Sequence, residues 1–96
     1  LRVPQPAYTE AARRDDVRAR VVVHVQVDAQ GRVTEAAVRG RWRVGNDGTE
    51  TAVDALGYGL EAAALAAARR ALFRPARDAG QAVATTTVIT FRFGPR

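Results

Sequence analysis

The chain has 96 residues, of which 47% are hydrophobic and 26% are charged, so it is long enough for one small domain with a single modest core. It contains no cysteine, serine, lysine or methionine, which excludes disulfides, thiolate metal sites and serine, cysteine or lysine nucleophiles. The net charge of +5 favours acidic partners. However, the arginines are scattered and no RNA-binding string is present, so we expect no nucleic-acid partner.

The sequence carries no membrane-span, signal-peptide, metal or cofactor motif. No stretch approaches the roughly 20 apolar residues that cross a bilayer. Because the chain begins with Leu1 rather than methionine, we expect it to be part of a longer protein. We interpret Asp15 and Asp16 as a solvated helix end, and Asp47 as part of a turn that lacks the other ligands of a calcium loop. We therefore expect neither a metal nor a cofactor.

The first elements are an extended lead-in, a short helix and a strand. Pro4 and Pro6 bias the residues before them away from helix. Thr9 can cap a short helix over residues 10–14. Residues 20–28 then place valine at every second position, which predicts a strand with one buried face.

Residues 28–59 predict a hairpin followed by a segment that is hard to interpret. Asp28 to Gly31 form a turn, and residues 32–39 form the second strand. Because Val33 and Val38 cannot share a face on strict alternation, we expect either a bulge near Ala36 and Ala37 or a weaker edge strand. Residues 40–59 are interpreted as an insert. Within it, residues 41–53 favour a small β-hairpin, while residues 52–56 could instead form one helical turn.

The last third predicts a helix, a turn and a final strand. Residues 60–72 are mostly strong helix formers, residues 78–80 form a turn, and residues 83–93 form the third strand. A right-handed crossover that skips one position places this strand beside the first one. We therefore expect a single α+β domain over residues 1–96, with a three-stranded antiparallel sheet in the order 2-1-3 and two helices on one face.

The third strand is expected to lie at a sheet edge. Its residues 83–90 carry no charge and no proline, whereas proteins usually protect such an edge against pairing with other chains. Two uses of the edge remain open, which are self-association and the addition of a peptide as an extra strand. A third alternative is that the C-terminal tail or the 40–59 insert covers it.

The sequence does not predict an enzyme. Its single histidine, His24, falls on the strand face opposite the valines and has no partner nearby in the sequence. We interpret it as a surface residue, because catalysis would also require a nucleophile or an orienting group. Trp42, the only tryptophan, is either a core residue or, if exposed, an anchor for a partner.

Five strings of residues occur here in an order and at spacings that match a known family. They are PAYTEAARR (6–14), RVVVHVQVDAQGRVT (20–34), LEAAAL (60–65), FRPARDAG (73–80) and ITFRF (89–93). With these strings the chain resembles the C-terminal domain of the TonB energy-transducer family. The resemblance covers nearly the whole chain apart from residues 40–59, and it implies a TonB C-terminal-like fold.

This resemblance also implies a function. Family members lie in the periplasm, anchored to the inner membrane by a helix that would precede this sequence. They capture an extended segment of an outer-membrane transporter by β-strand addition, and they transmit work from proton-driven inner-membrane motor proteins. Carried over by position, the captured peptide would lie along residues 85–90 and contact alternate side chains. The peptide-binding residues implied are Thr85, Thr86, Thr87, Val88, Thr90 and Arg92.

Two other functions stay open. The insert is longer than is usual in the family, which is compatible with an adapter in another cell-envelope machine for motility or secretion. An uncharged edge strand is also compatible with a homodimer built on that edge.

Overall fold

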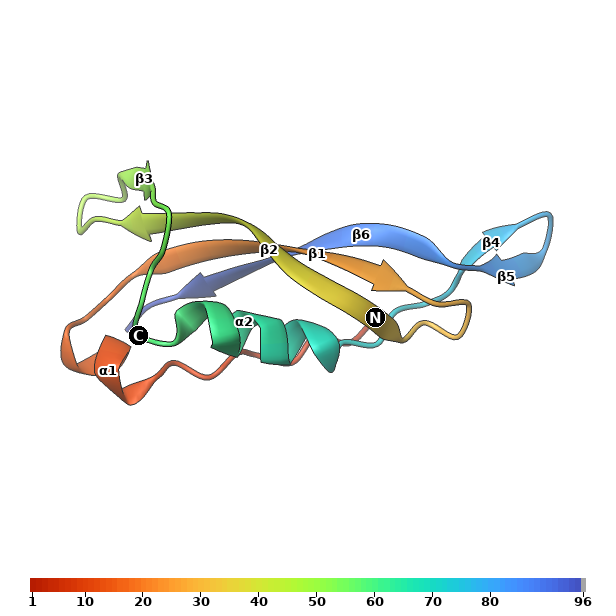
Figure 1. The fold of residues 1–96 in the computed structure, drawn as a ribbon, viewed down its shortest axis with the longest axis horizontal. Helices are drawn as coiled ribbons and strands as arrows, with labels where there is room; N and C mark the ends of the chain where they lie inside the picture. Colours follow the sequence, from red (N-terminus) through yellow and green to blue (C-terminus); the bar gives the residue numbers. More distant parts are fainter. Residues whose placement is uncertain (96) are drawn as a thin grey trace.

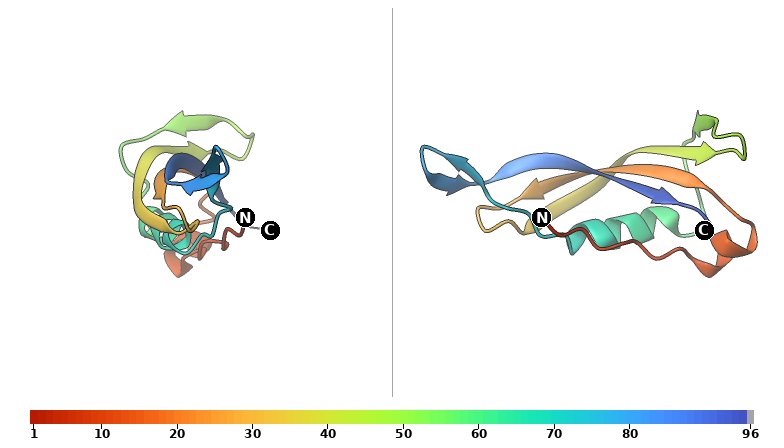
Figure 2. Two further views of the ribbon diagram at one scale, coloured as in Figure 1. Left: turned by 90° about the vertical axis from the view of Figure 1, so that its right-hand side faces the viewer. Right: turned by 180° about the vertical axis from the view of Figure 1, so that it is seen from behind.

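The computed structural model describes residues 1–95, which form an α+β domain measuring 48 × 22 × 21 Å. Four strands make one antiparallel sheet in the order β3-β2-β1-β6, and β4 and β5 make a separate hairpin (Figure 1). Both helices lie on one side of the four-stranded sheet (Figures 1 and 2). The elements are α1 (Glu10–Arg14), β1 (Ala19–Val27), β2 (Val33–Val44), β3 (Glu50–Ala52), α2 (Leu60–Arg69), β4 (Ala76–Asp78), β5 (Gln81–Val83) and β6 (Thr85–Phe93).

The central strand β1 carries the core, as its alternation predicts. Its valines at 21, 23, 25 and 27 are all buried, each at most 2% exposed. They pack with the alanine-rich stripe of α2, whose small side chains allow the helix to lie close to the sheet. Burial of each valine contributes roughly 1.5 kcal/mol or more. The core therefore lies between one face of β1 and α2, which leaves the other sheet face without a helix.

The short helix α1 and its cap are confirmed. The Thr9 hydroxyl accepts a hydrogen bond from the Ala12 amide at 3.2 Å and donates one to the Tyr58 carbonyl at 2.6 Å. The Tyr8 hydroxyl donates to the Val17 carbonyl at 2.7 Å. These bonds attach α1 to the start of β1 and to the loop before α2, so the helix has a fixed position at one end of the sheet.

The prediction of three strands is wrong, because the insert supplies a fourth. The turn at Gly45–Gly48 is closed by a backbone bond from Gly48 to Gly45 of 2.9 Å and by a bond from the Thr49 amide to the Asp47 carboxylate of 3.0 Å. The turn folds β3 back onto the end of β2, where it pairs with residues 42–44. The β-hairpin alternative is therefore confirmed, and the helical turn at 52–56 is wrong.

The second strand is longer than predicted, and its bulges lie elsewhere. It runs to Val44 rather than Arg39. Its register against β1 shifts at Thr34 and at Arg39, so the bulges do not lie near Ala36 and Ala37. Beyond the second bulge, the Trp42 ring lies over Gly40, so closely that a Cβ at Gly40 would overlap it. The bulge and this glycine together place Trp42 on the face without helices.

The boundaries near the C-terminal end also differ from the prediction. Helix α2 ends at Arg69 rather than Leu72, because Leu72 is extended and forms backbone bridges with Arg2 and Arg32. The turn at residues 78–80 is confirmed, and it joins β4 to β5 in a hairpin that extends beyond the end of the sheet (Figure 1). The last strand consequently begins at Thr85 rather than Val83.

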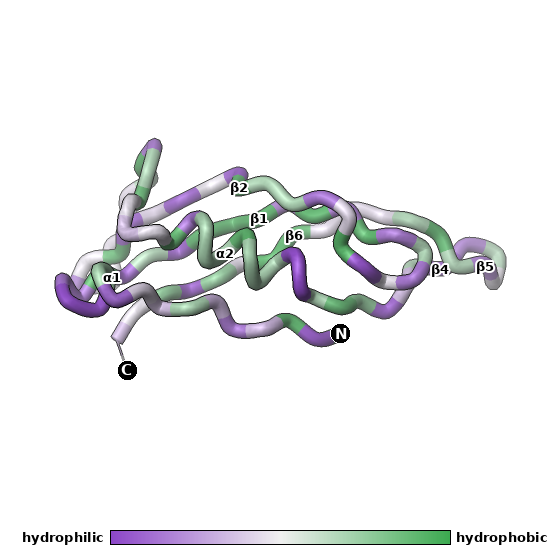
Figure 3. The backbone as a smooth tube through the Cα atoms, turned by 60° about the horizontal axis from the view of Figure 1, so that its bottom comes forward, coloured by the Kyte–Doolittle hydropathy of each residue, from purple (hydrophilic) through white to green (hydrophobic). Residues whose placement is uncertain are grey.

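The N-terminal residues 1–9 run extended alongside α2, on the side of the helix layer that lies nearest to β6 (Figures 2 and 3). A pair of backbone bonds between Arg2 and Leu72, of 2.7 and 2.8 Å, attaches the start of this segment. The lead-in therefore forms part of the layer that contains the helices. None of the helices in residues 1–95 has both the length and the apolar character that a membrane span requires.

Candidate functional site

All six residues carried over from the family resemblance lie on one element, the edge strand β6. The side chains of Ile89, Phe91 and Phe93 are buried toward α2, while Thr86, Val88, Thr90 and Arg92 are exposed on the opposite face. Thr85 is exposed at the start of the strand and Thr87 is half-buried. The alternation along β6 thus presents a row of side chains on the face without helices.

The backbone register shows which peptide groups of β6 point away from the sheet. The backbone N–H of Asp28 donates to the Arg32 carbonyl at 2.8 Å, and the N–H of Val44 donates to the Arg18 carbonyl at 2.9 Å. The peptide groups of the even-numbered residues of β1 therefore point toward β2. In an antiparallel ladder the alternate residues face the other neighbour, which here is β6. The odd-numbered residues of β1 pair with the odd-numbered residues of β6 without a register shift. The N–H and C=O groups of Thr86, Val88, Thr90 and Arg92 therefore point to the outer edge.

The outer edge of β6 is unpaired within the described chain. The strand is terminal in the sheet, and among residues 1–95 no backbone hydrogen bond reaches it from the lead-in or the insert. The insert instead covers part of the opposite edge, at β2. The side chain of Val88, midway along β6, is 52% exposed. The edge can accept hydrogen bonds, donate them, and offer an apolar contact to an added strand.

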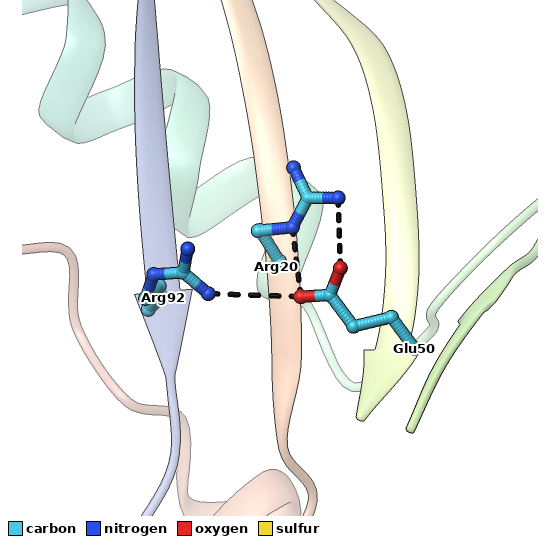
Figure 4. Close-up of polar contacts among 3 residues, drawn as sticks. All are labelled: Arg20, Glu50 and Arg92. Carbon is cyan, nitrogen blue, oxygen red and sulfur yellow. Dashed lines mark hydrogen bonds and ion pairs between the residues drawn. The ribbon is translucent and has the colours of Figure 1, made fainter. Parts of the chain in front are cut away.

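A cluster of three charged residues lies near the C-terminal end of β6, on the sheet face without helices, which we call the open face (Figure 4). The Arg20 guanidinium donates two hydrogen bonds to the Glu50 carboxylate, at 2.9 and 3.0 Å, and Arg92 lies 3.6 Å from the same carboxylate. The hydrogen bonds from Arg20, and then the positive charges of Arg20 and Arg92, hold the pKa of Glu50 below its ordinary value. The cluster connects β3, β1 and β6 across the sheet.

Trp42 is neither a fully buried core residue nor a freely exposed anchor for a partner, and it lies beside Arg20 of the charged cluster. Its side chain is half-buried over Gly40, and the Arg20 guanidinium stacks 3.8 Å from the centre of its ring. A guanidinium over an indole face is an attractive contact. Arg20 therefore bridges Trp42 and Glu50, which gives this part of the open face a fixed arrangement of side chains.

His24 is exposed on β1, opposite Ala37 of β2 and Val88 of β6. Among the described residues its side chain makes no hydrogen bond or ion pair. Residues 1–95 also contain no group of three or more His, Asp or Glu side chains that could hold a metal ion. Within the described residues no hydrogen bond or ion pair therefore orients the His24 imidazole, although it lines a cavity of about 630 Å³ together with Glu35 and Arg39.

A pocket that no sequence motif predicts lies at the C-terminal end of β6. It has a volume of about 510 Å³ and lies between the lead-in, α1 and the end of β6, with Gln5, Tyr8, Arg13, Arg92 and Phe93 among its lining residues. These residues come from three separate parts of the sequence. No local spacing connects them, although the alternation in β6 did identify Arg92 as exposed.

No protein-family model matches the chain, and no curated protein matches it.

Proposed function

We propose that this chain is a periplasmic, TonB C-terminal-like domain that captures an extended segment of an outer-membrane protein by β-strand addition at β6. In this proposal it is a binding domain rather than an enzyme. A membrane anchor preceding residue 1 connects it to proton-driven motor proteins of the inner membrane. The captured segment belongs to a transporter or to another protein of the cell envelope.

One observation carries the proposal, which is the free backbone along the outer edge of β6. Four residues, Thr86, Val88, Thr90 and Arg92, direct their peptide groups outward along a nine-residue strand. An added strand would gain main-chain hydrogen bonds that depend little on its own sequence. Its side chains would then contact the exposed row on the open face. This combination suits a partner defined by an extended conformation more than by a unique sequence.

The same geometry suits the transmission of force. A peptide paired along β6 and pulled parallel to the strand loads several hydrogen bonds together. Strand β1, which holds β6, lies at the centre of the sheet and is anchored in the core by its buried valines. A load on β6 therefore passes into the strand whose side chains form much of the buried core.

The proposal is tested by titrating isotope-labelled protein with short peptides from outer-membrane transporters. We expect backbone NMR shifts to concentrate in residues 85–93, with the largest changes at the outward amides of Val88 and Thr90. The proposal is wrong if no extended peptide perturbs this strand.

A pair of variants at one position makes the test specific. Val88→Pro removes an outward amide that has no backbone partner among residues 1–95, and proline is tolerated in edge strands at such positions. Val88→Thr keeps that amide and a β-branched side chain. We expect both variants to fold, and the proline variant to bind peptide at least about ten-fold more weakly than the threonine variant, because strand addition uses the main chain. Equal affinities would contradict pairing at this edge.

The homodimer alternative gives a different result in the same experiment. If two copies pair through β6, the NMR shifts of the outward amides change with protein concentration in the absence of peptide. Sedimentation would then detect dimers. We expect the free domain to be monomeric, with these shifts independent of concentration.

A further inference from the structure

An exposed leucine lies between two arginines where three distant segments of the chain meet. Leu72, just after α2, forms antiparallel backbone bridges with Arg2 of the lead-in and with Arg32, which precedes β2. Backbone bonds of 2.7 and 2.8 Å join Leu72 to Arg2, and on the other side the Phe73 N–H donates to the Gly31 carbonyl at 2.8 Å. Residues directly opposite one another in an antiparallel pairing direct their side chains to the same face. The side chains of Arg2, Leu72 and Arg32 therefore stand side by side.

The face that carries these three side chains points away from the core. In the segment after α2, Ala71 is 1% exposed and Phe73 packs against the core, so the side chain between them turns to the opposite side. Leu72 is accordingly 50% exposed, although leucine is among the residues most often buried. The fold thus holds an apolar side chain in solvent between two arginines.

Two further arginines flank Leu72 along the chain. Arg70 follows the last turn of α2, Arg74 precedes Pro75, and both are exposed. A residue before proline favours an extended backbone, which places Arg74 on the same side of the segment as Leu72. Within residues 1–95, none of these arginine side chains forms an ion pair or a hydrogen bond. We call the set the arginine–leucine patch, which consists of Arg2, Arg32, Arg70, Leu72 and Arg74.

Nearby acidic residues do not neutralise the patch. The Asp28 carboxylate accepts hydrogen bonds from the backbone N–H groups of Gln30 and Arg32, each of 2.9 Å, and so stabilises the turn before β2. Glu35 and Asp78 are exposed. None of these three carboxylates pairs with a guanidinium within residues 1–95. The positive charge of the patch is therefore available to an anionic partner.

The chemistry of the patch fits an anionic lipid surface better than a peptide strand or a nucleic acid. The backbone groups of Leu72 are bonded to Arg2, so the centre of the patch offers no free edge for strand addition. None of its five residues is aromatic, so it lacks the stacking surface that single-stranded nucleic acids use. Cations around an exposed aliphatic side chain suit a bilayer interface, where charges meet phosphates and the apolar group enters the acyl boundary.

We propose that the arginine–leucine patch docks the domain on a bilayer that contains anionic phospholipids. The guanidiniums contact headgroup phosphates through charge-assisted hydrogen bonds, and Leu72 enters the boundary between headgroups and acyl chains. The patch shares no residue with β6, so the inference goes beyond the proposed function and does not depend on it. Docking through this patch gives the domain a fixed orientation on the membrane surface.

The test measures binding of the protein to sedimented vesicles, made either of phosphatidylcholine alone or with about 40% phosphatidylglycerol. We expect the anionic vesicles to bind at least about ten-fold more tightly, with a difference that shrinks as salt is added. Arg32→Gln and Arg74→Gln should each weaken binding to anionic vesicles about five-fold, because each removes one charge at the surface. Leu72→Thr should weaken it about three-fold while leaving every charge in place.

A matched control separates the patch from the general positive charge of the domain. Arg14 is exposed on α1, at the opposite end of the sheet (Figure 1), and forms no ion pair within residues 1–95. Arg14→Gln changes the net charge by the same amount as Arg32→Gln, yet it should change vesicle binding by less than about two-fold. Circular dichroism should show that all four variants keep the fold, because each substituted residue is exposed.

The proposal is wrong if neutral and anionic vesicles bind equally, or if Arg14→Gln loses as much binding as Arg32→Gln. Unchanged binding by Leu72→Thr would contradict the insertion of the leucine. Soluble competitors test the other anionic partners. If glycerophosphate, an acidic peptide or a single-stranded oligonucleotide binds more tightly than anionic vesicles at equal charge concentration, the assignment to a lipid surface is overturned. Each of these results leaves peptide capture at β6 to its own test.

Discussion

The two edges of the four-stranded sheet are built in opposite ways. Strand β2 has two bulges and several charged side chains, and β3 pairs with its last residues. Strand β6 has no register shift against β1, and Arg92 is its one charged residue. Bulges, charges and covering segments are the usual protections of an edge strand. The domain applies all three at β2 and none of them along residues 85–91 of β6.

This difference shows that the unprotected edge does not follow from the size of the domain or from a shortage of covering chain. The insert contains enough residues to cover an edge, and it covers part of β2. The lead-in runs on the β6 side of the helix layer and makes no backbone hydrogen bond to β6 within the described residues. The open edge at β6 is therefore a specific feature of this fold, and function is the simplest reason for keeping it.

The largest expected loss of stability comes from a proline at an inward-pointing amide of β6, compared with a proline at an outward-pointing amide. Thr87 pairs with Val25, and its amide points into the sheet. Thr87→Pro removes that hydrogen bond and leaves a partner group in the central strand unsatisfied, so we expect a loss of about 2–4 kcal/mol of unfolding free energy. Val88→Pro is the control, with an expected loss below about 1 kcal/mol. Denaturant unfolding monitored by circular dichroism measures both, and equal losses would contradict the register.

A smaller loss of stability is expected from a substitution in β2. Gly40→Ala introduces a Cβ that overlaps the Trp42 ring, so the ring must move away from its contact with Arg20. We expect a loss of about 1 kcal/mol and a red shift of the tryptophan fluorescence. In a Trp42→Leu background the same substitution should cost much less, because the overlapping ring is gone. An unchanged cost in that background would place the strain elsewhere.

The smallest effect concerns the attachment of β3. Arg20 lowers the pKa of Glu50. The stability that their pairing contributes is therefore fully present above the ordinary pKa of a glutamate, and it is lost as the pH falls through the lowered pKa of Glu50. We expect the NMR shifts of Thr51 and Ala52 to change in that acidic range. Glu50→Gln should show the acid-state shifts already at neutral pH. A carboxyl group that titrates at the ordinary value for glutamate would contradict the bidentate pairing.

Much of the fold was predictable because its signals are local. The alternating valines of β1 identify a central strand, and Thr9 identifies the start of α1. The order of the three long strands followed from the right-handed crossover rule, and the structure has it. In each of these cases the residues that carry the signal are neighbours in the sequence, or the topology leaves few alternatives.

The remaining features depend on residues that are distant in the sequence. The bulges of β2 lie where its pairing with β1 and the packing of Trp42 require them, and periodicity alone does not locate such positions. Helix α2 stops before Leu72 because that residue pairs with Arg2 and Arg32. The residues that line the pocket at the C-terminal end of β6, Arg13 and Arg92 among them, come from distant parts of the sequence, so the pocket has no sequence signal of its own.

The central claim is that the outer edge of β6 is free, and residue-resolved amide hydrogen exchange of the peptide-free monomer tests it most directly. We predict that the outward amides of Thr86, Val88 and Thr90 exchange at least about ten-fold faster than the inward amides of Thr87 and Ile89. Similar protection of both groups in the monomer would mean that another part of the chain already pairs with this edge, and would contradict the account.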